Sequence, residues 1–403
     1  MKKDLPVTNN NNRLLKTKDD VIGIVRQCIS LDKPLSKELK NSGLTYDDLC
    51  YEDNFKPTYK KQKVFTLNDF KESESRIPII SFFSGAGGLD LGFEALGFQH
   101  TLLVEKVPLF CETLKLNRPE WHVYNGDISK KEEMISEISK YIDGNEFDGV
   151  FVGGPPCQPF SIAANQRFSK NGDNFKRVGF SHETNGNLLF DYIELIKKFR
   201  PKVFLIENVP GLMEIDDGEQ LAVAYADLEA VGYKMNDPIV LRADHYYVPQ
   251  QRIRLFIIGS RTDKLLIPPK PSDDSMVCGN VFEIPLSGIE NHITRAHSAE
   301  SVERYMKLPY GARDQKGRVD RLDPTKPSKT IIAGGTKGGG RSHLHPYFPR
   351  TLSVRESARL QTFPDDYVFT GPVARQFTQV GNAVPPVLAA QLAKAIKDSF
   401  FRE

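Results

Sequence analysis

The sequence predicts an α/β protein with a doubly wound, mainly parallel sheet and a smaller, irregular second domain. From residue 77 onward, apolar runs alternate with segments of helical periodicity, the pattern of strands connected by helices. The first run is apolar almost throughout, as in strands buried on both faces, and a glycine-rich turn follows it directly. Ligands of such sheets bind beyond the carboxyl ends of the strands, so functional residues are expected there.

The apolar runs mark the strands in chain order. They occupy residues 76–83, 100–105, 122–127, 147–154, 202–209 and 253–260. Helices are expected between them, where apolar residues recur at helical spacing, at 107–117, 129–140, 187–199 and 217–230. Two more are expected in the C-terminal part, at 353–363 and, beginning around a proline pair, at 381–400.

Residues 1–75 are expected to form a helical extension of unassigned role. Apolar residues between 21 and 29 share one helical face, and a second short helix is expected around Leu35 and Leu39. The stretch KPTYKKQK at 56–63 is interpreted as a basic linker. A packed extension without chemistry is the favoured interpretation, and a small DNA-binding or regulatory module is the alternative.

Composition favours a globular protein, since 39% of the residues are hydrophobic and 26% are charged. No apolar run approaches a membrane span, and no secretory signal follows the first lysines, so a cytoplasmic location without membrane association is expected. Five cysteines without a CxxC pair indicate a reducing compartment, and neither disulfides nor a metal site is expected.

Positive charge is concentrated late in the chain. Residues 295–359 hold 14 Lys and Arg against 6 Asp and Glu, an excess of 8 positive charges. Such an excess fits a surface that binds a polyanion, although charge alone fits a solvated surface equally well.

Polar residues follow the first three strands and suggest a nucleoside cofactor. Gly85 and Gly88 belong to the turn after the first strand, where a ligand can approach the backbone at a helix N-terminus. Asp90 stands where a dinucleotide fingerprint requires glycine, which argues against a nucleotide-dependent oxidoreductase. Glu105 ends the second strand, where an acid binds a ribose diol, and Asp127 follows the third, placed to bind an adenine amine.

The fourth strand ends in GGPPCQPFS, residues 153–161. Its prolines exclude a helix interior and hold Cys157 on a stiff turn at the edge where ligands bind. A thiol needs help to become a nucleophile, because its ordinary pKa is about 8.5. The other cysteines are interpreted as inert small apolar residues; they are Cys28, Cys50, Cys111 and Cys278.

The fifth strand ends in Glu207 and Asn208, and Glu207 is a candidate proton donor. Arg252 and Arg254 are two residues apart as the chain enters the next strand, so both are expected on one face. Neighbouring arginines repel each other unless they hold carboxylates or phosphates. One of them is expected to pair with Glu207 or to contact a substrate carbonyl.

These motifs together resemble the cytosine-C5 DNA methyltransferases of bacterial restriction–modification systems. The matching stretches run in order from 80 to 386: FFSGAGGLDLGFE, Glu105, NGDIS, GGPPCQPFS, GNLLFDYI, ENVPG, PQQRIRLFIIG, RESARLQTFPD and GNAVPP. The resemblance implies the Rossmann-like fold of S-adenosylmethionine-dependent methyltransferases. It also implies methyl transfer from this cofactor, without a metal, to C5 of a flipped-out cytosine in a specific double-stranded DNA sequence, through a covalent cysteine–C6 intermediate.

The resemblance assigns a catalytic role to each strand-end residue. Cys157 would attack C6 of the cytosine, Glu207 would bind N3 and the 4-amino group, and Asn208 would support the site. Arg252 would contact the base carbonyl, and Arg254 would order the pocket.

The resemblance also assigns binding residues and domains. The cofactor would be lined by Phe83, Gly85, Gly88, Glu105, Asp127, Ile128, Pro156, Leu188, Asn382 and Val384. DNA contacts are expected from Thr330, Ile331, Lys337 and Arg341. Residues 76–263 would form the catalytic and cofactor-binding domain, 264–350 the target-recognition domain, and 351–403 a part that returns to the catalytic domain.

The expected partner is double-stranded DNA, and the enzyme is expected to be a monomer. It would protect host DNA from a restriction endonuclease that acts at the same site, without forming a stable complex with that endonuclease. Ser81 and Asn185 depart from common family residues, Asp and Arg, without affecting the expected chemistry. Two alternatives stay open: the tRNA-modifying branch that shares these motifs, and a catalytically dead binder. The basic insert argues against the first, and intact Cys157, Glu207 and Arg252 argue against the second.

Overall fold

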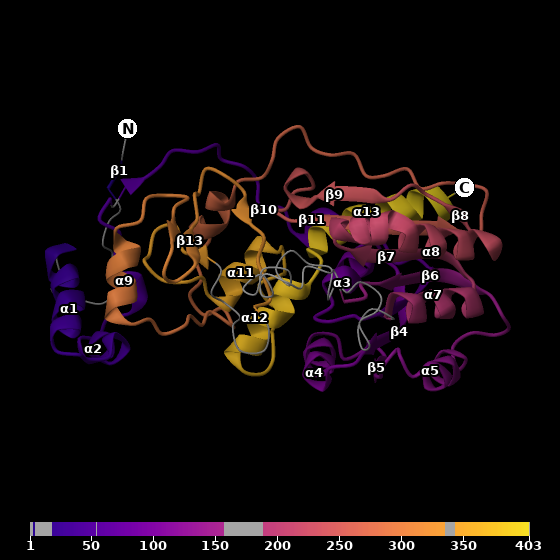
Figure 1. Ribbon diagram of the computed structural model, residues 1–403, viewed down its shortest axis with the longest axis horizontal. Helices are drawn as coiled ribbons and strands as arrows, with labels where there is room; N and C mark the ends of the chain where they lie inside the picture. Colours follow the sequence, from indigo (N-terminus) through magenta and orange to yellow (C-terminus); the bar gives the residue numbers. More distant parts are fainter. Residues whose placement is uncertain (1–2, 5–17, 54, 157–187, 335–342, 403) are drawn as a thin grey trace. The chain divides into compact units, whose positions relative to one another are not determined.

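The computed structural model describes residues 3–4, 18–53, 55–156, 188–334 and 343–402 (Figure 1). Contacts divide the chain into two compact units. The N-terminal unit comprises Met1–Val64, Tyr247–Gln251 and Asp274–Asn382, and the sheet unit comprises Phe65–Tyr246, Arg252–Asp273 and Ala383–Glu403. Both units are therefore assembled from separate stretches of chain.

The sheet unit is organised around a mainly parallel sheet, which confirms the predicted fold class. The strands follow the order β5-β4-β3-β6-β7-β11-β8, with β9 paired to β11. Their bounds are β3 Pro78–Phe82, β4 Gln99–Glu105, β5 Val123–Asn125, β6 Phe147–Gly153, β7 Pro201–Asn208, β8 Lys234–Met235, β9 Ile239–Arg242 and β11 Ile253–Ser260. From β5 to β7 the pairings are parallel, whereas β11 runs antiparallel to β7. The start of β11 therefore lies beside the end of β7.

Helices cover the sheet because its strands are apolar on both faces. Their bounds are α3 Gly88–Ala95, α4 Pro108–Asn117, α5 Lys131–Ile138, α7 Leu188–Phe199, α8 Glu219–Ala230 and α13 Pro386–Phe400. Ile80, Phe151 and Phe204 are fully buried in one core with α5, α7 and α8. Residues that alternate with them, such as Val150 and Leu205, are equally buried on the opposite face.

The last helix begins at the proline pair, as predicted, and it is preceded by another helix that was not predicted. Helix α12 spans Val373–Asn382, and α13 begins at Pro386. The chain cannot continue one helix through Pro385 and Pro386, because proline lacks a backbone donor and clashes with the preceding turn. Helix α13 packs closely on α3: a Cβ added at Gly92 would lie 2.4 Å from the Cβ of Ala389.

The N-terminal unit combines helices with very short strands. The helices are α1 Lys18–Ser30, α2 Leu35–Asn41, α9 Ala299–Met306, α11 Val354–Leu360 and α12. The strands are β1 Lys3–Asp4, β2 Phe55–Lys56, β10 Gln250–Gln251, β12 Arg313–Asp314, β13 Val319–Arg321, β14 Ser328–Lys329 and β15 His343–Leu344. Within its described residues, the stretch expected to be irregular thus contains one α-helix and four short strands.

The first helices pack against α9, as Figure 1 shows. Val21 and Val25 of α1 share a buried core with Val302 and Met306. The lysines of the expected basic linker pair with acids of the same unit: the Lys56 ammonium lies 3.1 Å from Glu283, and Lys61 and Lys60 pair with Glu283 and Asp274. Residues 18–63 are therefore a structural part of the N-terminal unit, and the paired lysines are neutralised.

A buried ion network joins the first and the last chain stretch of this unit. The Arg350 guanidinium donates two hydrogen bonds of 2.8 Å to Glu356 and also pairs with Asp47. Burial opposes ionisation of Glu356, but Arg350 outweighs it and lowers the pKa of this carboxyl to about 2. The pKa of Asp47 is lowered as well, where hydrogen bonds and the charge of Arg350 again overcome burial.

Candidate functional site

The turn after β3 has a backbone conformation that side chains rarely adopt. Phe83 has φ +55°, Gly85 has φ +56° and Gly87 has φ +72°, after which α3 begins at Gly88. Glycine adopts this region without steric cost, whereas Phe83 is strained, a feature that often marks ligand sites. The turn lies where the strand order reverses direction, since β3 has β4 on one side and β6 on the other.

Glu105 fastens this turn to the end of β4. One carboxylate oxygen accepts the Gly85 N–H at 2.8 Å, and the other accepts the Val107 N–H at 2.7 Å. These two hydrogen bonds fix the direction in which the carboxylate points. The side chain is therefore oriented before any ligand binds.

The next acid, Asp127, follows β5 and pairs with the Lys106 ammonium at 2.7 Å. Burial opposes its ionisation, but Lys106 and the Ser129 donors outweigh this effect and lower the pKa of the carboxyl. Among the other expected cofactor residues, Ile128, Leu188 and Val384 are buried, while Pro156 and Asn382 are exposed.

Asp90 has a partner that sequence analysis missed. Its carboxylate is fully buried in the first turn of α3 and lies 3.3 Å from Nε2 of His100, at the start of β4. The His100 ring also stacks near Trp121, with the ring centroids 4.5 Å apart. In the sequence, the only sign of this buried pair is that Asp90 stands where a dinucleotide fingerprint has glycine.

Glu207 and Arg254 form a buried ion pair at the end of β7. Nε of Arg254 lies 2.8 Å from Oε1 of Glu207, and the two side chains are 15% and 9% exposed. The pair is diagonal across the antiparallel strands, because Glu207 lies opposite Phe256 and Arg254 is two residues away on the same face. The structure thus identifies which of the two arginines holds the acid.

Gly154, the first residue after β6, lies against this pair. A Cβ added at Gly154 would be 2.9 Å from Oε2 of Glu207. Asn208 is buried beside the acid, and its side-chain oxygen accepts the Val209 N–H at 2.9 Å. Arg252 is fully buried, and its carbonyl accepts the Ala243 N–H at 2.9 Å. A buried carboxylate held by a guanidinium can orient a planar base through directed hydrogen bonds.

In the N-terminal unit, Thr330 and Ile331 are held by Gln250 and its neighbour. The Thr330 hydroxyl donates to the carbonyl of Gln251 at 2.7 Å, and the Ile331 N–H donates to Oε1 of Gln250 at 2.9 Å. Gln250 is fully buried and donates to the Gln361 side chain at 3.0 Å. Gln250 was not among the predicted site residues, although it precedes Arg252 and Arg254 in the stretch PQQRIRLFIIG.

Gly381, in the GNAVPP motif, packs closely against the segment that follows Thr330 and Ile331. An added Cβ would lie 2.4 Å from the backbone nitrogen of Ala333 and 2.5 Å from the carbonyl carbon of Ile332. Only glycine leaves room for this approach between α12 and residues 330–333.

Three predicted site residues lie outside the described residues: Cys157, Lys337 and Arg341. The four described cysteines are buried free thiols. Burial raises the pKa of the Cys28 and Cys278 thiols, and raises that of Cys111 to about 11. These thiols stay protonated near neutral pH, which fits inert packing residues.

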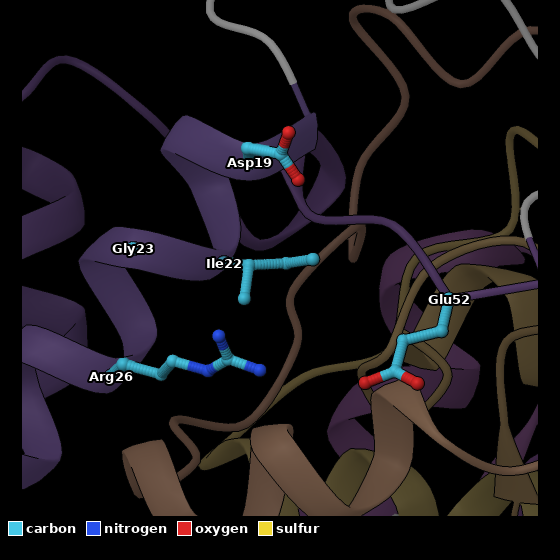
Figure 2. A pocket seen from close by; sticks show the side chains of 5 residues that line it. All are labelled: Asp19, Ile22, Gly23, Arg26 and Glu52. Carbon is cyan, nitrogen blue, oxygen red and sulfur yellow. The ribbon is translucent and has the colours of Figure 1, made fainter.

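An open hollow of about 630 Å³ lies in the N-terminal unit. It is lined by Asp19, Ile22, Gly23, Arg26 and Glu52. Figure 2 shows Ile22 and Arg26 extending from α1 toward the side where Glu52 lies. No predicted site residue lines it.

Across the described ranges, no cluster of His, Cys, Asp and Glu suited to a metal ion is found. Within the same ranges, every helix is too short or too polar to cross a membrane.

Comparison with known proteins agrees with this geometry. A family model described as C-5 cytosine-specific DNA methylase matches residues 77–398. The type II methyltransferase M.PspPI of Psychrobacter sp. is 36% identical over 79% of this chain and 78% of its own length. The type II methyltransferase M.Eco47II of Escherichia coli is 32% identical over 82% of this chain and 81% of its own length.

The fold is also shared with solved structures. A prophage-encoded protein of E. coli, assigned as a DNA modification methyltransferase, aligns with a TM-score of 0.63 and 24% identity, over 81% of this chain and all of its own. The resemblance seen in the motifs is thus confirmed, and with it the prediction of a DNA cytosine-5-methyltransferase of the restriction–modification type. The chain belongs to the family of C-5 cytosine-specific DNA methylases.

Proposed function

We propose that the protein transfers a methyl group from S-adenosylmethionine to C5 of a cytosine flipped out of a specific double-stranded DNA sequence, with Cys157 as the covalent nucleophile. The Glu207–Arg254 pair at the end of β7 carries this proposal, because it presents an oriented carboxyl group beside the loop that leads to Cys157. Cys157 follows Gly154 by three residues, a stretch that spans at most about 11 Å.

The turn after β3 and the acids after β4 and β5 suit the cofactor. The glycines carry no side chain that would keep a ligand from the backbone at the start of α3, and the Glu105 carboxylate, oriented by the Gly85 and Val107 N–H groups, suits a ribose diol. S-adenosylmethionine would supply an electrophilic methyl group on a sulfonium. The chain's own task is to hold it beside the base.

Cytosine C5 is too weak a nucleophile to take this methyl group unaided. Addition of the Cys157 thiolate to C6 breaks the C5–C6 double bond and moves its electron pair toward C5. Glu207 takes up a proton from solvent as the base binds and donates it to N3, which neutralises the charge that this addition places on the ring. Arg254 holds the Glu207 carboxyl in place, and Arg252 would bind the base carbonyl.

The ring is restored after methyl transfer. The C5 proton leaves to a base, for which water suffices, and its electron pair reforms the C5–C6 double bond as the thiolate departs from C6. N3 returns its proton to Glu207, which releases it to solvent. Atoms and charges then balance, because the enzyme returns to its starting state and one proton is released.

The base must leave the duplex before Cys157 can reach it, at a cost of a few kcal/mol. Phosphate contacts of the basic 295–359 region would offset this cost and make binding sensitive to salt. We further propose that the enzyme acts as a monomer and protects host DNA from an endonuclease that cuts the same site, without forming a complex with it.

A mechanism-based substrate tests this proposal. Incubation with S-adenosylmethionine and duplex DNA containing 5-fluorocytosine at the target site should trap a covalent protein–DNA adduct, because fluorine cannot leave as the C5 proton does. Replacement of Cys157 by Ser should abolish the adduct and leave cofactor binding near normal. The target site is first located by bisulfite sequencing of DNA from a bacterial host that expresses the gene.

Three results would contradict the proposal. Binding of the fluorinated duplex without an adduct would indicate a dead binder. Methyl incorporation into tRNA and not into duplex DNA would indicate the RNA-modifying branch. Equal loss of adduct and cofactor binding in Cys157→Ser would show that the thiol has another role.

A further inference from the structure

One hairpin of the N-terminal unit presents consecutive exposed polar residues at its tip. Strands β12 and β13 pair antiparallel, with Arg313 opposite Asp320 and Asp314 opposite Val319. The four residues between them, Gln315–Arg318, are all exposed. The tip therefore projects from a paired base.

The base of the hairpin is firmly anchored. Val319 belongs to a small core with Tyr305 and Leu344. Arg321, at the end of β13, is buried and donates a hydrogen bond of 2.8 Å to Asp53. Its guanidinium carbon lies 3.5 Å from the ring centroid of Tyr51 and 3.7 Å from that of Tyr310. Rigid support of this kind makes an exposed side chain suitable for specific contact.

The tip itself is ordered, and one of its residues is strained. Oδ2 of Asp314 accepts the Gly317 N–H at 2.6 Å and thereby closes the turn. Arg318 has φ +52°, a left-handed conformation that glycine or asparagine usually occupies in such loops. An arginine at this position suggests that its side chain has a use that outweighs the strain.

Positive charge gathers around this tip. Arg313 and Lys329 share the buried Asp320, at 3.2 Å and 3.1 Å. Lys316 has an electrostatic interaction with the exposed Glu300, and no ion pair of Arg318 is found within the described stretches. Two cations thus share one acid, and the Arg318 guanidinium is left to face solvent.

The hairpin is built into the same framework as Thr330. Strand β15 pairs with β13, placing His343 opposite Asp320. Nε2 of His343 lies 3.2 Å from the carbonyl oxygen of Thr330. A contact made by the hairpin is therefore fixed relative to the segment expected near the flipped base.

We propose that the β12–β13 hairpin enters a groove of the DNA duplex and that Arg318, assisted by Lys316, contacts it beside the methylation site. This rests on the proposed function, because it assumes a duplex DNA substrate. A two-stranded ribbon fits the major groove, and an arginine there can bind guanine through two hydrogen bonds.

The strain at Arg318 allows a test that separates binding from folding. Arg318→Gly removes the guanidinium and relieves the strained φ, so the Tm should stay the same or rise. The same change should weaken binding to a duplex carrying the mapped site by about fivefold or more. Lys316→Ala should weaken it less and lower the dependence of affinity on salt.

Fluorescence anisotropy with this duplex at several salt concentrations measures the affinity. Lys37→Ala is the control, because Lys37 is an exposed cation of the same unit that lies on α2, outside the hairpin. Arg318→Lys, which keeps the charge and the strain, should retain part of the affinity. Wild-type affinity in Arg318→Gly and Lys316→Ala, with the wild type active on DNA, would overturn the hairpin proposal alone. A wild type that neither binds nor methylates any duplex would overturn the proposed function as well.

Discussion

Replacement of Arg254 by Ala tests whether the ion pair at the end of β7 holds Glu207. The guanidinium lies 2.8 Å from the carboxylate, and both side chains are largely buried. Removing one partner of a buried pair leaves an uncompensated charge and costs about 3–5 kcal/mol. Because both groups keep some solvent contact, the lower value, about 3 kcal/mol, is expected here.

This magnitude predicts two effects. Each kcal/mol lowers the Tm of a unit of this size by about 2–4 °C, so the sheet unit should melt about 6–12 °C earlier. A displaced Glu207 should also lower kcat for methylation by about 100-fold, as expected for a loss of about 3 kcal/mol in the transition state. Differential scanning calorimetry and a single-turnover assay with labelled S-adenosylmethionine measure the two effects.

Two further variants separate stability from catalysis. Arg254→Met combined with Glu207→Gln leaves no unpaired charge, so it should recover most of the Tm without recovering methylation. Arg261→Ala is the matched control: its partners Glu146 and Asp148, at 2.7 Å and 3.2 Å, are 50% and 91% exposed, and such exposed pairs contribute about 1 kcal/mol or less. Full kcat and an unchanged Tm in Arg254→Ala would refute the reasoning.

Three other predictions concern binding, packing and acid stability. Glu105→Ala should raise the Kd for S-adenosylmethionine about tenfold by calorimetry, because it removes a charged acceptor; an unchanged Kd would exclude Glu105 from the site. Gly381→Ala should lower the Tm by about 3–10 °C, since its Cβ would meet backbone, whereas Gly23→Ala, with nothing within 4 Å of the new Cβ, should not lower it. Because the pKa of Glu356 falls from 4.5 to about 2 on folding, about 3 kcal/mol of stability present above pH 4.5 should be lost as the pH falls toward 2. Urea titrations at several pH values should show this loss in the wild type and a smaller one in Glu356→Gln; equal slopes would show that the pair with Arg350 does not depress this pKa.

The sheet was predictable because each long strand is a continuous apolar run in the sequence. β7, for example, is apolar from Val203 to Ile206, and the polar Glu207 and Asn208 mark its end. Strand ends in turn placed Glu105 and Glu207 at the ligand edge. The sequence left open which arginine pairs with Glu207, because that depends on the register of β11 against β7.

Long-range packing was not predictable from local periodicity. Nothing in residues 18–63 signals that they bury Val21 and Val25 against α9 or that Asp47 meets Arg350, about 300 positions away along the chain. Gln250 was missed for the same reason, since its partners Ile331 and Gln361 come from distant segments.

The assembly of the N-terminal unit from three stretches of chain limits how the DNA contacts proposed for it can be re-engineered. A graft that exchanged only residues 264–350 with those of a relative would separate Arg321 from Tyr51 and Asp53, and Val302 from α1. Chimeric enzymes with new target sequences should therefore carry the first 64 residues along with the insert.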